Sequence, residues 1–381
     1  MAKSVAIVSC AWPPQGGGIG NNAHYHAKNL QQLGYRVAVF TPLYRHTAKD
    51  KSDLAVNYLP VFLPLGKAGF LFSIFKKLSG FDIVHLYYPF FGTDLLVLLY
   101  KIFHHRQKLI LHYQMDAVGN GWKKLFFRIY IILFFGLLVR VSDKIIVLSF
   151  DHAQNSHLKK WLKIFPEKFV EIPNGVETDL FKPAPPDIRL LEKYGINPNE
   201  PVILFVGGLD RQHYFKGVDV LLKTFKKINL QFVKSKLLII GDGDLKNDYE
   251  RQAEILGLSE KVIFTGWVDN ADLPDYYRLA KIFILPSTAR TESFGIVIAE
   301  AQACGVPAVV SSWPGSRQTL VDGGTGFLVQ PGSVEELSQK IVLLLSNEEM
   351  WNDFSRQAAL VAQSRYAWAE IIKKICQIYE R

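Results

Sequence analysis

The sequence predicts an α/β protein made of two Rossmann-like domains, each built on a doubly wound parallel sheet. Short apolar runs rich in β-branched residues alternate with amphipathic, helix-like stretches along almost the whole chain, and this alternation is typical of parallel sheets. A Pro-rich polar segment at 181–201 interrupts the alternation once. The chain has 381 residues, which at about 150 residues per domain indicates two cores rather than one.

The expected strands and helices follow one another regularly on both sides of that segment. In the first half we expect strands at 4–9, 36–41, 54–62, 82–87, 108–113, 143–149 and 168–173, and helices near 21–33, 69–78, 93–104, 122–140 and 150–163. In the second half we expect strands at 202–207, 236–241, 261–266, 281–287, 307–312 and 326–330, and helices near 217–229, 246–256, 271–279 and 295–303, with more helices after 330. Open α/β sheets bind ligands beyond the carboxyl ends of their strands. Two such domains in tandem therefore predict one ligand-binding cleft between them.

Composition narrows the class of protein and its partners. Hydrophobic residues make up 49% of the chain and charged residues 21%, so there is ample apolar surface to bury and no disordered composition. The net charge of +9 favours anionic partners such as phosphorylated substrates or acidic lipid surfaces. The sequence has no zinc-finger or RNA-recognition signature and no dense basic stripe, which argues against nucleic acid as a partner.

Cysteine spacing and apolar segments indicate a cytoplasmic protein. The three cysteines are far apart and form neither a disulfide nor a zinc pattern. The apolar stretch at the start, MAKSVAIVSC, is too short for a signal peptide. The longest uncharged apolar run, 129–139, is well below the roughly 20 residues that span a bilayer. Segments 67–78 and 122–140 interleave Lys and Arg with large apolar residues, as helices on anionic lipid do. Packing of an internal helix explains the second segment equally well.

The first βα loop carries a run of glycines, which are Gly16, Gly17, Gly18 and Gly20. Glycines let a ligand approach the backbone closely, and the start of the helix after them favours an anion. The spacing differs from G-x-G-x-x-G, and the second expected strand ends in Phe40-Thr41-Pro42, where an NAD site has an acidic residue for the ribose. An NAD-dependent oxidoreductase is therefore the less favoured alternative. A tight turn without a ligand also explains the glycines.

The sharpest signal is the segment TESFGIVIAEAQACGVPAVVSS at 291–312. Ser293 is a suitable N-cap for a helix that follows it. Glu292 then stands just before the helix and Glu300 within it. A carboxylate accepts two hydroxyl donors at once, which suits a ribose diol at Glu300 and sugar hydroxyls at Glu292. The first free N–H groups of the helix would hold a phosphate, and they belong to Phe294, Gly295 and Ile296.

The Glu-x7-Glu spacing in ESFGIVIAE, followed by A-x-A-x-G-x-P, resembles the donor site of the family 4 retaining glycosyltransferases, which have the GT-B fold. Further segments match in the same order: GGGIG, IPNGVETDLF, FVGGLDRQHYFKG, GDGD, FTGWV and DGGTGFLV. The resemblance extends over essentially the whole chain. It implies a hexosyltransferase that moves a sugar from GDP-mannose or a UDP-sugar to an acceptor hydroxyl.

The resemblance implies which residues hold the donor. Family members use a Lys and an Arg of the first loop of the second domain to bind the donor pyrophosphate, a role that needs fixed positive charge. Lys216 matches directly, whereas Gly208 occupies the usual place of the Arg and the loop is longer, so Arg211 is the candidate. Val268 stands where family members meet the base, and Gly18 faces the donor from the first domain. GDGD matches a structural turn, and neither metal nor cofactor is expected.

The resemblance also places His112, at the end of an expected first-domain strand, opposite the transferred sugar. Retention of configuration is implied, with the departing diphosphate taking the acceptor proton, and the residues expected to serve catalysis are His112, Lys216, Arg211 and Glu292. The acceptor side is expected to use Gly17, His85, Tyr87 and Asp116, with Gln114 and Tyr88 as weaker candidates. Core packing explains the aromatic side chains equally well.

Domain bounds and cellular context follow from the same resemblance. We expect an acceptor-binding domain at 1–182, a nucleotide-sugar-binding domain at 183–363 and a helix at 364–381 that crosses back to the first domain. The expected acceptor is a lipid-linked or oligosaccharide molecule of cell-surface glycan synthesis, reached from the cytoplasmic side with peripheral contact to the inner face of the plasma membrane. A catalytically silent GT-B subunit that binds a nucleotide-sugar is the main alternative.

Overall fold

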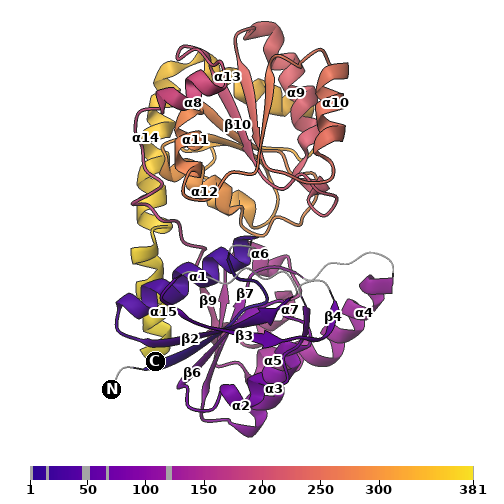
Figure 1. The fold of residues 1–381 in the computed structure, drawn as a ribbon, viewed down its shortest axis with the longest axis vertical. Coiled ribbons are helices and arrows are strands. Elements are labelled where there is room, and N and C mark those ends of the chain that lie inside the picture. Colours follow the sequence, from indigo (N-terminus) through magenta and orange to yellow (C-terminus); the bar gives the residue numbers. More distant parts are fainter. Residues whose placement is uncertain (1–2, 14–16, 45–51, 66–67, 117–121, 381) are drawn as a thin grey trace. The chain divides into compact units, whose positions relative to one another are not determined.

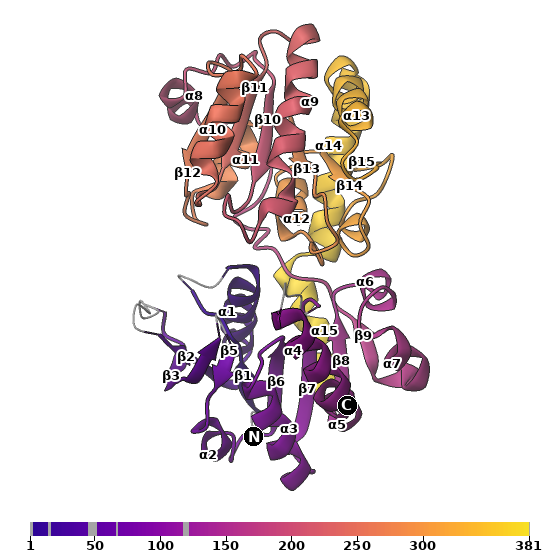
Figure 2. The same ribbon diagram turned by 90° about the vertical axis from the view of Figure 1, so that its right-hand side faces the viewer.

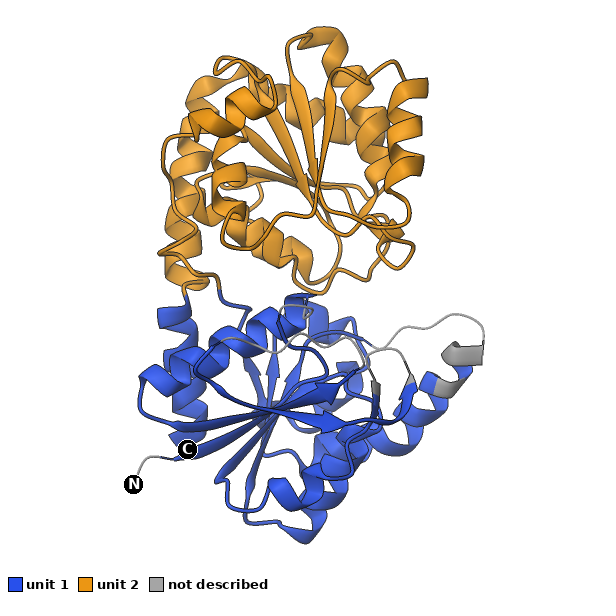
Figure 3. Ribbon diagram, viewed as in Figure 1, with its two compact units in different colours: residues 1–175, 368–381 blue, residues 176–367 orange. Residues whose placement is uncertain are grey.

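The computed structural model describes residues 3–13, 17–44, 52–65, 68–116 and 122–380. The chain divides into two compact units (Figure 3): unit 1 comprises Met1–Gly175 and Trp368–Arg381, and unit 2 comprises Val176–Ala367. The breaks fall at 175–176 and 367–368, compared with the expected 182–183 and 363–364. Val176 lies in unit 2 because it forms a parallel bridge with Ala367, its amide donating to the Tyr366 carbonyl at 2.7 Å.

Unit 1 is built on a parallel sheet of seven strands in the order β3-β2-β1-β6-β7-β8-β9. The central strands are buried along nearly their whole length, because helices cover both faces of such a sheet. The order reverses between β1 and β6, and this switch point is where doubly wound sheets bind ligands. The strands are β1 (Ser4–Val8), β2 (Arg36–Leu43), β3 (Ala55–Pro60), β6 (Ile83–Tyr88), β7 (Lys108–Tyr113), β8 (Lys144–Val147) and β9 (Phe169–Glu171).

Two helical layers enclose this sheet (Figure 1). Helices α1 (Gly17–Gln32) and α15 (Trp368–Glu380) pack side by side on one face, where Ala23 and Ala27 share a core with Ile371 and Ile375. The final helix therefore completes a layer of the first unit. The other face is covered by α2 (Ile74–Lys77), α3 (Thr93–Phe103), α5 (Gly136–Val141) and α7 (Lys159–Ile164), and the remaining helical segments are α4 (Trp122–Tyr130), η1 (Ile131–Phe135), α6 (Phe150–Gln154) and η2 (Pro166–Lys168).

The segment expected to form a helix near 69–78 is mostly not helical. Its first residues form β5 (Ala68–Phe70), which pairs antiparallel with β4 (Phe62–Leu65), and only α2 is helical. The Gly69 amide donates to the Phe91 carbonyl, and the Gly69 carbonyl accepts the Thr93 hydroxyl at 2.7 Å. The backbone groups of this segment are therefore paired with neighbouring chain rather than with each other, so a helix cannot extend through it.

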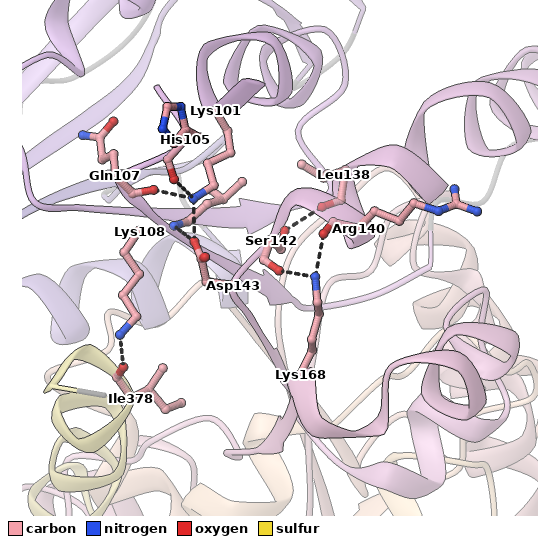
Figure 4. Close-up of polar contacts among 11 residues, drawn as sticks. Lys101, His105, Gln107, Lys108, Leu138, Arg140, Ser142, Asp143, Lys168 and Ile378 are labelled. Atoms are coloured by element: carbon pink, nitrogen blue, oxygen red, sulfur yellow. Dashed lines mark hydrogen bonds and ion pairs between the residues drawn. The ribbon is translucent and has the colours of Figure 1, made fainter. Parts of the chain in front are cut away.

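Lysines stabilise helix ends at the amino-terminal edge of the unit 1 sheet (Figure 4). Lys108 donates to the Ile378 carbonyl at 2.7 Å, and Lys3 donates to the Tyr379 carbonyl at 2.8 Å, both at the end of α15. Lys168 likewise donates to the Ser142 carbonyl at 2.8 Å, just after α5. Cations favour helix C-termini because the carbonyl groups there are unpaired and carry the negative end of the helix dipole.

Replacing Lys108 with methionine is expected to loosen α15 locally. The change keeps the aliphatic stem but removes a charged hydrogen bond at the helix end, a loss of about 1 kcal/mol. Amide hydrogen exchange in 368–380 should then become roughly fivefold faster. Lys236→Met is the matched control, because Lys236 caps the Glu260 carbonyl in unit 2. Unchanged exchange in α15 of Lys108→Met would contradict this role.

Unit 2 is a six-stranded parallel sheet in the order β12-β11-β10-β13-β14-β15. In chain order this is the doubly wound 3-2-1-4-5-6 arrangement, with its switch point between β10 and β13. The strands are β10 (Val202–Val206), β11 (Lys236–Ile240), β12 (Val262–Gly266), β13 (Ile282–Leu285), β14 (Ala308–Ser311) and β15 (Gly326–Val329).

The helices of unit 2 form two groups (Figure 2). Helix α9 packs against α10 and α13, whereas α12 packs against α11 and α14. Their bounds are α8 (Ile188–Lys193), η3 (Tyr214–Lys216), α9 (Val218–Gln231), α10 (Lys246–Ile255), α11 (Leu273–Leu279), α12 (Ile296–Ala303), η4 (Ser316–Thr319), α13 (Val334–Ser346) and α14 (Glu348–Arg365). Because β10 and β13 are neighbouring parallel strands on either side of the switch point, the loops that follow them meet there.

Candidate functional site

Helix α12 begins beside the switch point of unit 2, and its N-cap stands two residues after the predicted N-cap Ser293. Gly295 is its N-cap, with a left-handed φ of 74°, and no side chain caps the helix. This backbone conformation favours glycine, and a Cβ at Gly295 would also lie 2.6 Å from the end of the Ile298 side chain. Ser293 is therefore not the N-cap. With Gly295 as N-cap, the first turn offers the N–H groups of Gly295 and Ile296. Phe294 precedes the cap and is buried, and its carbonyl accepts the Thr319 hydroxyl.

Lys216 and Glu292 form an ion pair that joins the loops after β10 and β13. Lys216 Nζ lies 2.8 Å from Glu292 Oε2, and only 13% and 16% of the two side chains are exposed. The Lys216 stem crosses the backbone at Gly207, where a Cβ would lie 2.7 Å from Lys216 Cδ. The Thr288 amide also donates to the Phe215 carbonyl at 2.7 Å, which ties the same two loops together. The structure thus holds one cation and one anion at the switch point.

Glu300, one turn into α12, is the second carboxylate of this site. Its Oε2 accepts the Tyr277 hydroxyl at 2.8 Å. Burial raises the pKa of Glu300 to about 7, against the opposing effects of the Tyr277 hydrogen bond and of the Lys216 charge. Lys216 is therefore close enough to act on both carboxylates. The structure thus brings Lys216, Glu292 and Glu300 together in one cluster, and their roles in donor binding stay predictions.

Three other predicted donor residues lie apart from that cluster. Arg211 pairs with Asp244, its Nε 3.2 Å from Asp244 Oδ2, and 81% of its side chain is exposed. Gly208 lies under His213, where a Cβ would be 2.9 Å from the ring nitrogen Nδ1. Val268 is half-buried and stands two residues after the end of β12. Among the described residues, no hydrogen bond or ion pair joins Arg211, Gly208 or Val268 to Lys216, so their donor roles stay predictions.

The GDGD segment forms a tight turn against the loop after β10. Asp244 Oδ1 accepts the Arg211 amide at 2.9 Å, and Asp242 Oδ1 accepts the Gly243 amide at 2.9 Å. Both carboxylates are thus engaged by nearby groups of the protein. Within the described ranges, no three His, Cys, Asp or Glu side chains lie close enough together to hold a metal ion. The absence of metal and cofactor stays a prediction.

In unit 1, three of the predicted residues lie together at the carboxyl ends of β6 and β7. Tyr87 is the register partner of His112, and their rings stack with centroids 4.6 Å apart. His85 Nε2 lies 3.0 Å from His112 Nδ1. Burial lowers the pKa of both imidazoles well below the usual value, so both are neutral. His112 Nε2 is buried with no hydrogen-bond partner among the described residues, which leaves it available to a ligand.

The remaining first-domain candidates have separate environments. Asp116 accepts the Tyr113 hydroxyl and pairs with His157 at 3.0 Å; burial raises its pKa, but these contacts outweigh burial and lower the pKa to about 2. Gly17 and Gly18 are exposed and open α1, which begins four residues before the expected start. Gly16 lies outside the described residues. The weaker candidate Gln114 is buried, and its Nε2 has no partner in the described part of the chain.

Two family models match the chain in succession. The one described as "Glycosyltransferase Family 4" matches residues 16–180, and the one described as "Glycosyl transferases group 1" matches residues 187–361. The chain belongs to glycosyltransferase family 4. The resemblance inferred from ESFGIVIAE is therefore confirmed.

Several curated family 4 relatives are mannosyltransferases. The GDP-mannose-dependent α-(1-6)-phosphatidylinositol monomannoside mannosyltransferase of Mycolicibacterium smegmatis is 32% identical over 204 residues, 52% of this chain and 50% of that protein. The phosphatidyl-myo-inositol mannosyltransferase of Mycobacterium leprae is 34% identical over 211 residues, 55% and 53% respectively. The chain thus spans about half the length of these relatives. An uncharacterized 41.2 kDa protein in the cps region of Klebsiella pneumoniae is 27% identical over 350 residues, 89% of this chain and 86% of that protein.

Solved structures of similar fold extend over the full chain. A glycosyltransferase from Rickettsia africae ESF-5 has a TM-score of 0.79 at 21% identity, covering 100% of this chain and 98% of that one. HepE from Anabaena in complex with UDP-glucose has a TM-score of 0.77 at 21% identity and covers 99% of both chains. The predicted GT-B fold of two Rossmann-like units is confirmed.

Sequence reasoning did not single out several polar residues that lie beside the predicted ones. Tyr277 is the buried partner of Glu300, and Ser287 Oγ and Thr291 Oγ1 are buried with no partner among the described residues. The two hydroxyls belong to the loop that carries Glu292, so their position in PSTARTESFG was an available signal. Tyr277 lies on α11, and nothing in its local sequence connects it with Glu300.

Affinity for a nucleotide-sugar is expected to rise with pH up to about 7. The free protein holds Glu300 with a pKa raised to about 7, whereas accepting two hydroxyl donors, one at each oxygen, needs the carboxylate form. Below that pH the ligand must displace a proton, which weakens binding by about tenfold per pH unit. Calorimetry with GDP-mannose from pH 5.5 to 8.5 checks this. Glu300→Gln should bind with an affinity that does not vary over this range, and a wild-type affinity that falls with rising pH would contradict the assignment.

Proposed function

We propose that the protein is a retaining hexosyltransferase that moves mannose from GDP-mannose, or a hexose from a UDP-sugar, to a hydroxyl of a lipid-linked or oligosaccharide acceptor. The observation that carries the proposal is the Lys216–Glu292 ion pair beside Glu300 at the switch point of unit 2. GDP-mannose is the first choice of donor because two family 4 relatives are named mannosyltransferases, one of them GDP-mannose-dependent.

The donor is proposed to bind with its diphosphate against Lys216 and the start of α12. The ammonium supplies a fixed positive charge, and the unpaired N–H groups at Gly295 and Ile296 supply hydrogen-bond donors. Glu300 accepts the ribose hydroxyls, and Glu292 exchanges part of its contact with Lys216 for hydroxyls of the sugar. Each of these groups already stands at the switch point, so little reorganisation is needed before reaction.

Transfer is proposed to proceed with retention and without a carboxylate nucleophile. Glu292 is the carboxylate nearest to Lys216, and its charge is already engaged by the ammonium group at 2.8 Å. The bond from the anomeric carbon to the diphosphate oxygen breaks while the acceptor oxygen forms a bond on the same face. The leaving diphosphate takes the acceptor proton, and Lys216 stabilises its developing charge. His112 is proposed to hydrogen-bond the sugar or the acceptor through Nε2.

The experiment that tests the function combines binding with transfer. Thermal-shift measurements with GDP, UDP, ADP and their sugars identify the donor, because a ligand that binds only the native state raises the melting temperature. The selected radiolabelled sugar is then incubated with protein and with phosphatidylinositol vesicles or oligosaccharide acceptors. Transfer to acceptor or slow release of free sugar is expected. Nucleotide binding without either reaction would favour the catalytically silent subunit, and binding of NADH alone would favour the oxidoreductase.

We propose that the protein also contacts the inner face of the plasma membrane through unit 1. The described helices include none long and apolar enough to cross a membrane. The continuous helical segment α4–η1–α5 nevertheless exposes a stripe of apolar side chains at helical spacing: Leu125, Ile129, Ile132, Leu133 and Leu137. Exposed Arg128 lies on the same segment. An apolar stripe with flanking basic residues is typical of helices that lie on anionic lipid.

The apolar stripe is expected to control binding to anionic vesicles. In sedimentation with phosphatidylserine-containing vesicles at low salt, wild-type protein should pellet, and Ile129→Gln/Leu133→Gln should lose most of this binding because about 3 kcal/mol of apolar burial is removed. Leu230→Gln is the matched control, since Leu230 is an equally apolar and exposed residue of unit 2. Failure of the wild-type protein to pellet, or equal pelleting of both variants, would refute membrane contact.

A further inference from the structure

A continuous chain of hydrogen bonds leads from His112 through the interior of unit 1 to Tyr87. His85 Nε2 lies 3.0 Å from His112 Nδ1, and His85 Nδ1 lies 2.7 Å from the Tyr379 hydroxyl. The same hydroxyl lies 3.2 Å from His26 Nε2, and His26 Nδ1 lies 3.0 Å from the Tyr87 hydroxyl. All five side chains are buried. This hydrogen-bond network thus has four hydrogen bonds, which join two tyrosine hydroxyls and three imidazoles.

All three imidazoles are neutral, so the protons of the chain can be counted. Burial lowers the pKa of His26 to about 3 and lowers those of His85 and His112 well below the usual value. Each neutral imidazole carries one N–H and one acceptor nitrogen, and each hydroxyl carries one proton. Five protons are therefore available for four bonds, and the fifth must stand at one end of the chain.

One direction of donation leaves only one polar atom of the network unpaired among the described residues, His112 Nε2, which is unpaired in either direction. The Tyr87 hydroxyl donates to His26 Nδ1, His26 Nε2 to the Tyr379 oxygen, and the Tyr379 hydroxyl to His85 Nδ1. His85 Nε2 then donates to His112 Nδ1, and the fifth proton stands on His112 Nε2. In the opposite direction the Tyr87 proton is left buried without an acceptor among the described residues, which costs about 1 to 3 kcal/mol.

We propose that His85, Tyr379 and His26 are positioning residues that hold His112 as the Nε2–H tautomer, so that it presents a hydrogen-bond donor to an oxygen of the substrate. Two contacts fix the orientation of the His112 imidazole: its Nδ1 is hydrogen-bonded to His85, and its face stacks on Tyr87. Among the ring nitrogens of His26, His85 and His112, only His112 Nε2 is buried without a partner in the described part of the protein. A substrate oxygen at this atom would complete the chain.

Tyr379 gives the final helix a role in this chain. It lies on α15 and is hydrogen-bonded to His85, 294 positions earlier in the sequence. The position of its hydroxyl depends on the end of α15, where Lys3 and Lys108 hold the carbonyl groups of Tyr379 and Ile378. The inference rests on the proposed function only for the identity of the substrate oxygen. The tautomer itself is a property of the free protein.

Nitrogen-15 NMR of histidine-labelled full-length protein tests the tautomer directly. A protonated and an unprotonated imidazole nitrogen differ widely in chemical shift, so His112, assigned by loss of its signals in His112→Gln, is expected to show a protonated Nε2 and an unprotonated Nδ1. In Tyr379→Phe the chain is interrupted, both directions of the His85–His112 bond become equally satisfied, and His112 should become a mixture of tautomers. Tyr35→Phe is the matched control, because Tyr35 packs near Tyr379 and its hydroxyl contacts Cys376 of α15, outside the chain.

Kinetics provide the second measurement. In Tyr379→Phe, kcat for release of GDP from GDP-mannose should fall by about two- to tenfold, from loss of the correct tautomer and of ring orientation, with KM little changed. His85→Leu should lose more activity than His85→Gln, which retains an amide group near the position of Nε2. His85→Leu and His85→Gln test the same positioning role if Tyr379→Phe does not fold.

The outcomes separate this inference from the proposed function. A wild-type His112 protonated at Nδ1, or a charged His112, overturns the inference whatever the enzyme transfers. So does a tautomer unchanged in both Tyr379→Phe and His85→Leu. Absence of any sugar transfer by the wild-type protein refutes the proposed function, whereas the NMR result still decides the tautomer.

Discussion

Replacing Lys216 with alanine is expected to lower kcat for sugar transfer by about 100- to 1000-fold, the usual effect of removing one group that stabilises charge in a transition state. Lys216 is largely shielded from solvent beside Glu292 at the switch point, where a dielectric lower than that of water strengthens its effect on a departing diphosphate. Affinity for the nucleotide should fall much less than kcat. Steady-state kinetics and calorimetry with GDP separate the two quantities.

Lys223→Ala is the control for this prediction. Lys223 lies on α9 shortly after Lys216 and forms a long, exposed contact with Asp219 at 4.0 Å, and such surface pairs contribute little. Its replacement should leave kcat unchanged. A near-normal kcat in Lys216→Ala, with folding verified by circular dichroism, would remove Lys216 from the chemical step.

Replacing Glu300 with alanine is expected to weaken donor binding by about 10- to 100-fold, because two charge-assisted hydrogen bonds to the ribose are lost at about 1.5 to 3 kcal/mol in all. The change also leaves the Tyr277 hydroxyl, which Glu300 Oε2 accepts at 2.8 Å, without its acceptor. Glu300→Gln should lose less, since the amide oxygen still accepts one bond. Isothermal titration with GDP and GDP-mannose measures the difference.

Glu254→Ala provides the comparison for Glu300, because Glu254 is an exposed glutamate of α10. Its replacement should leave donor affinity within twofold of wild type. If Glu300→Ala bound GDP as tightly as wild type while kcat fell, Glu300 would act on the reacting sugar and not on the nucleotide.

The alternation of strands and helices was sufficient to predict the fold. Buried parallel strands such as β1 and β10 are continuous apolar runs, and this pattern is visible without knowing their neighbours. The prediction failed where tertiary pairing decided the local structure. Residues 68–70 became a strand because β4 and the Phe91–Thr93 segment pair with them, and nothing within 67–78 indicates that pairing.

The candidate site was predicted in part for a similar reason. Glu292 and Glu300 belong to one segment, and their spacing around a helix start carries the signal. The N-cap of that helix was misplaced because Ser293 is a typical N-cap, whereas the observed N-cap is Gly295 in the left-handed conformation, with no side chain capping the helix. Tyr277 and Tyr379 were beyond sequence reasoning, since each meets its partner only after distant segments have packed.

The placement of α15 in unit 1 has a consequence for how the protein is synthesised. Residues 176–367 form one continuous unit that can fold as it leaves the ribosome, but unit 1 must wait for 368–380. At about 5 to 20 residues per second this delay lasts about 10 to 40 s. Throughout that time the apolar surface around Ala23 and Ala27 lacks its cover and is open to chaperones or to aggregation. A stop codon that removes 368–380 would therefore damage the unit that was translated first.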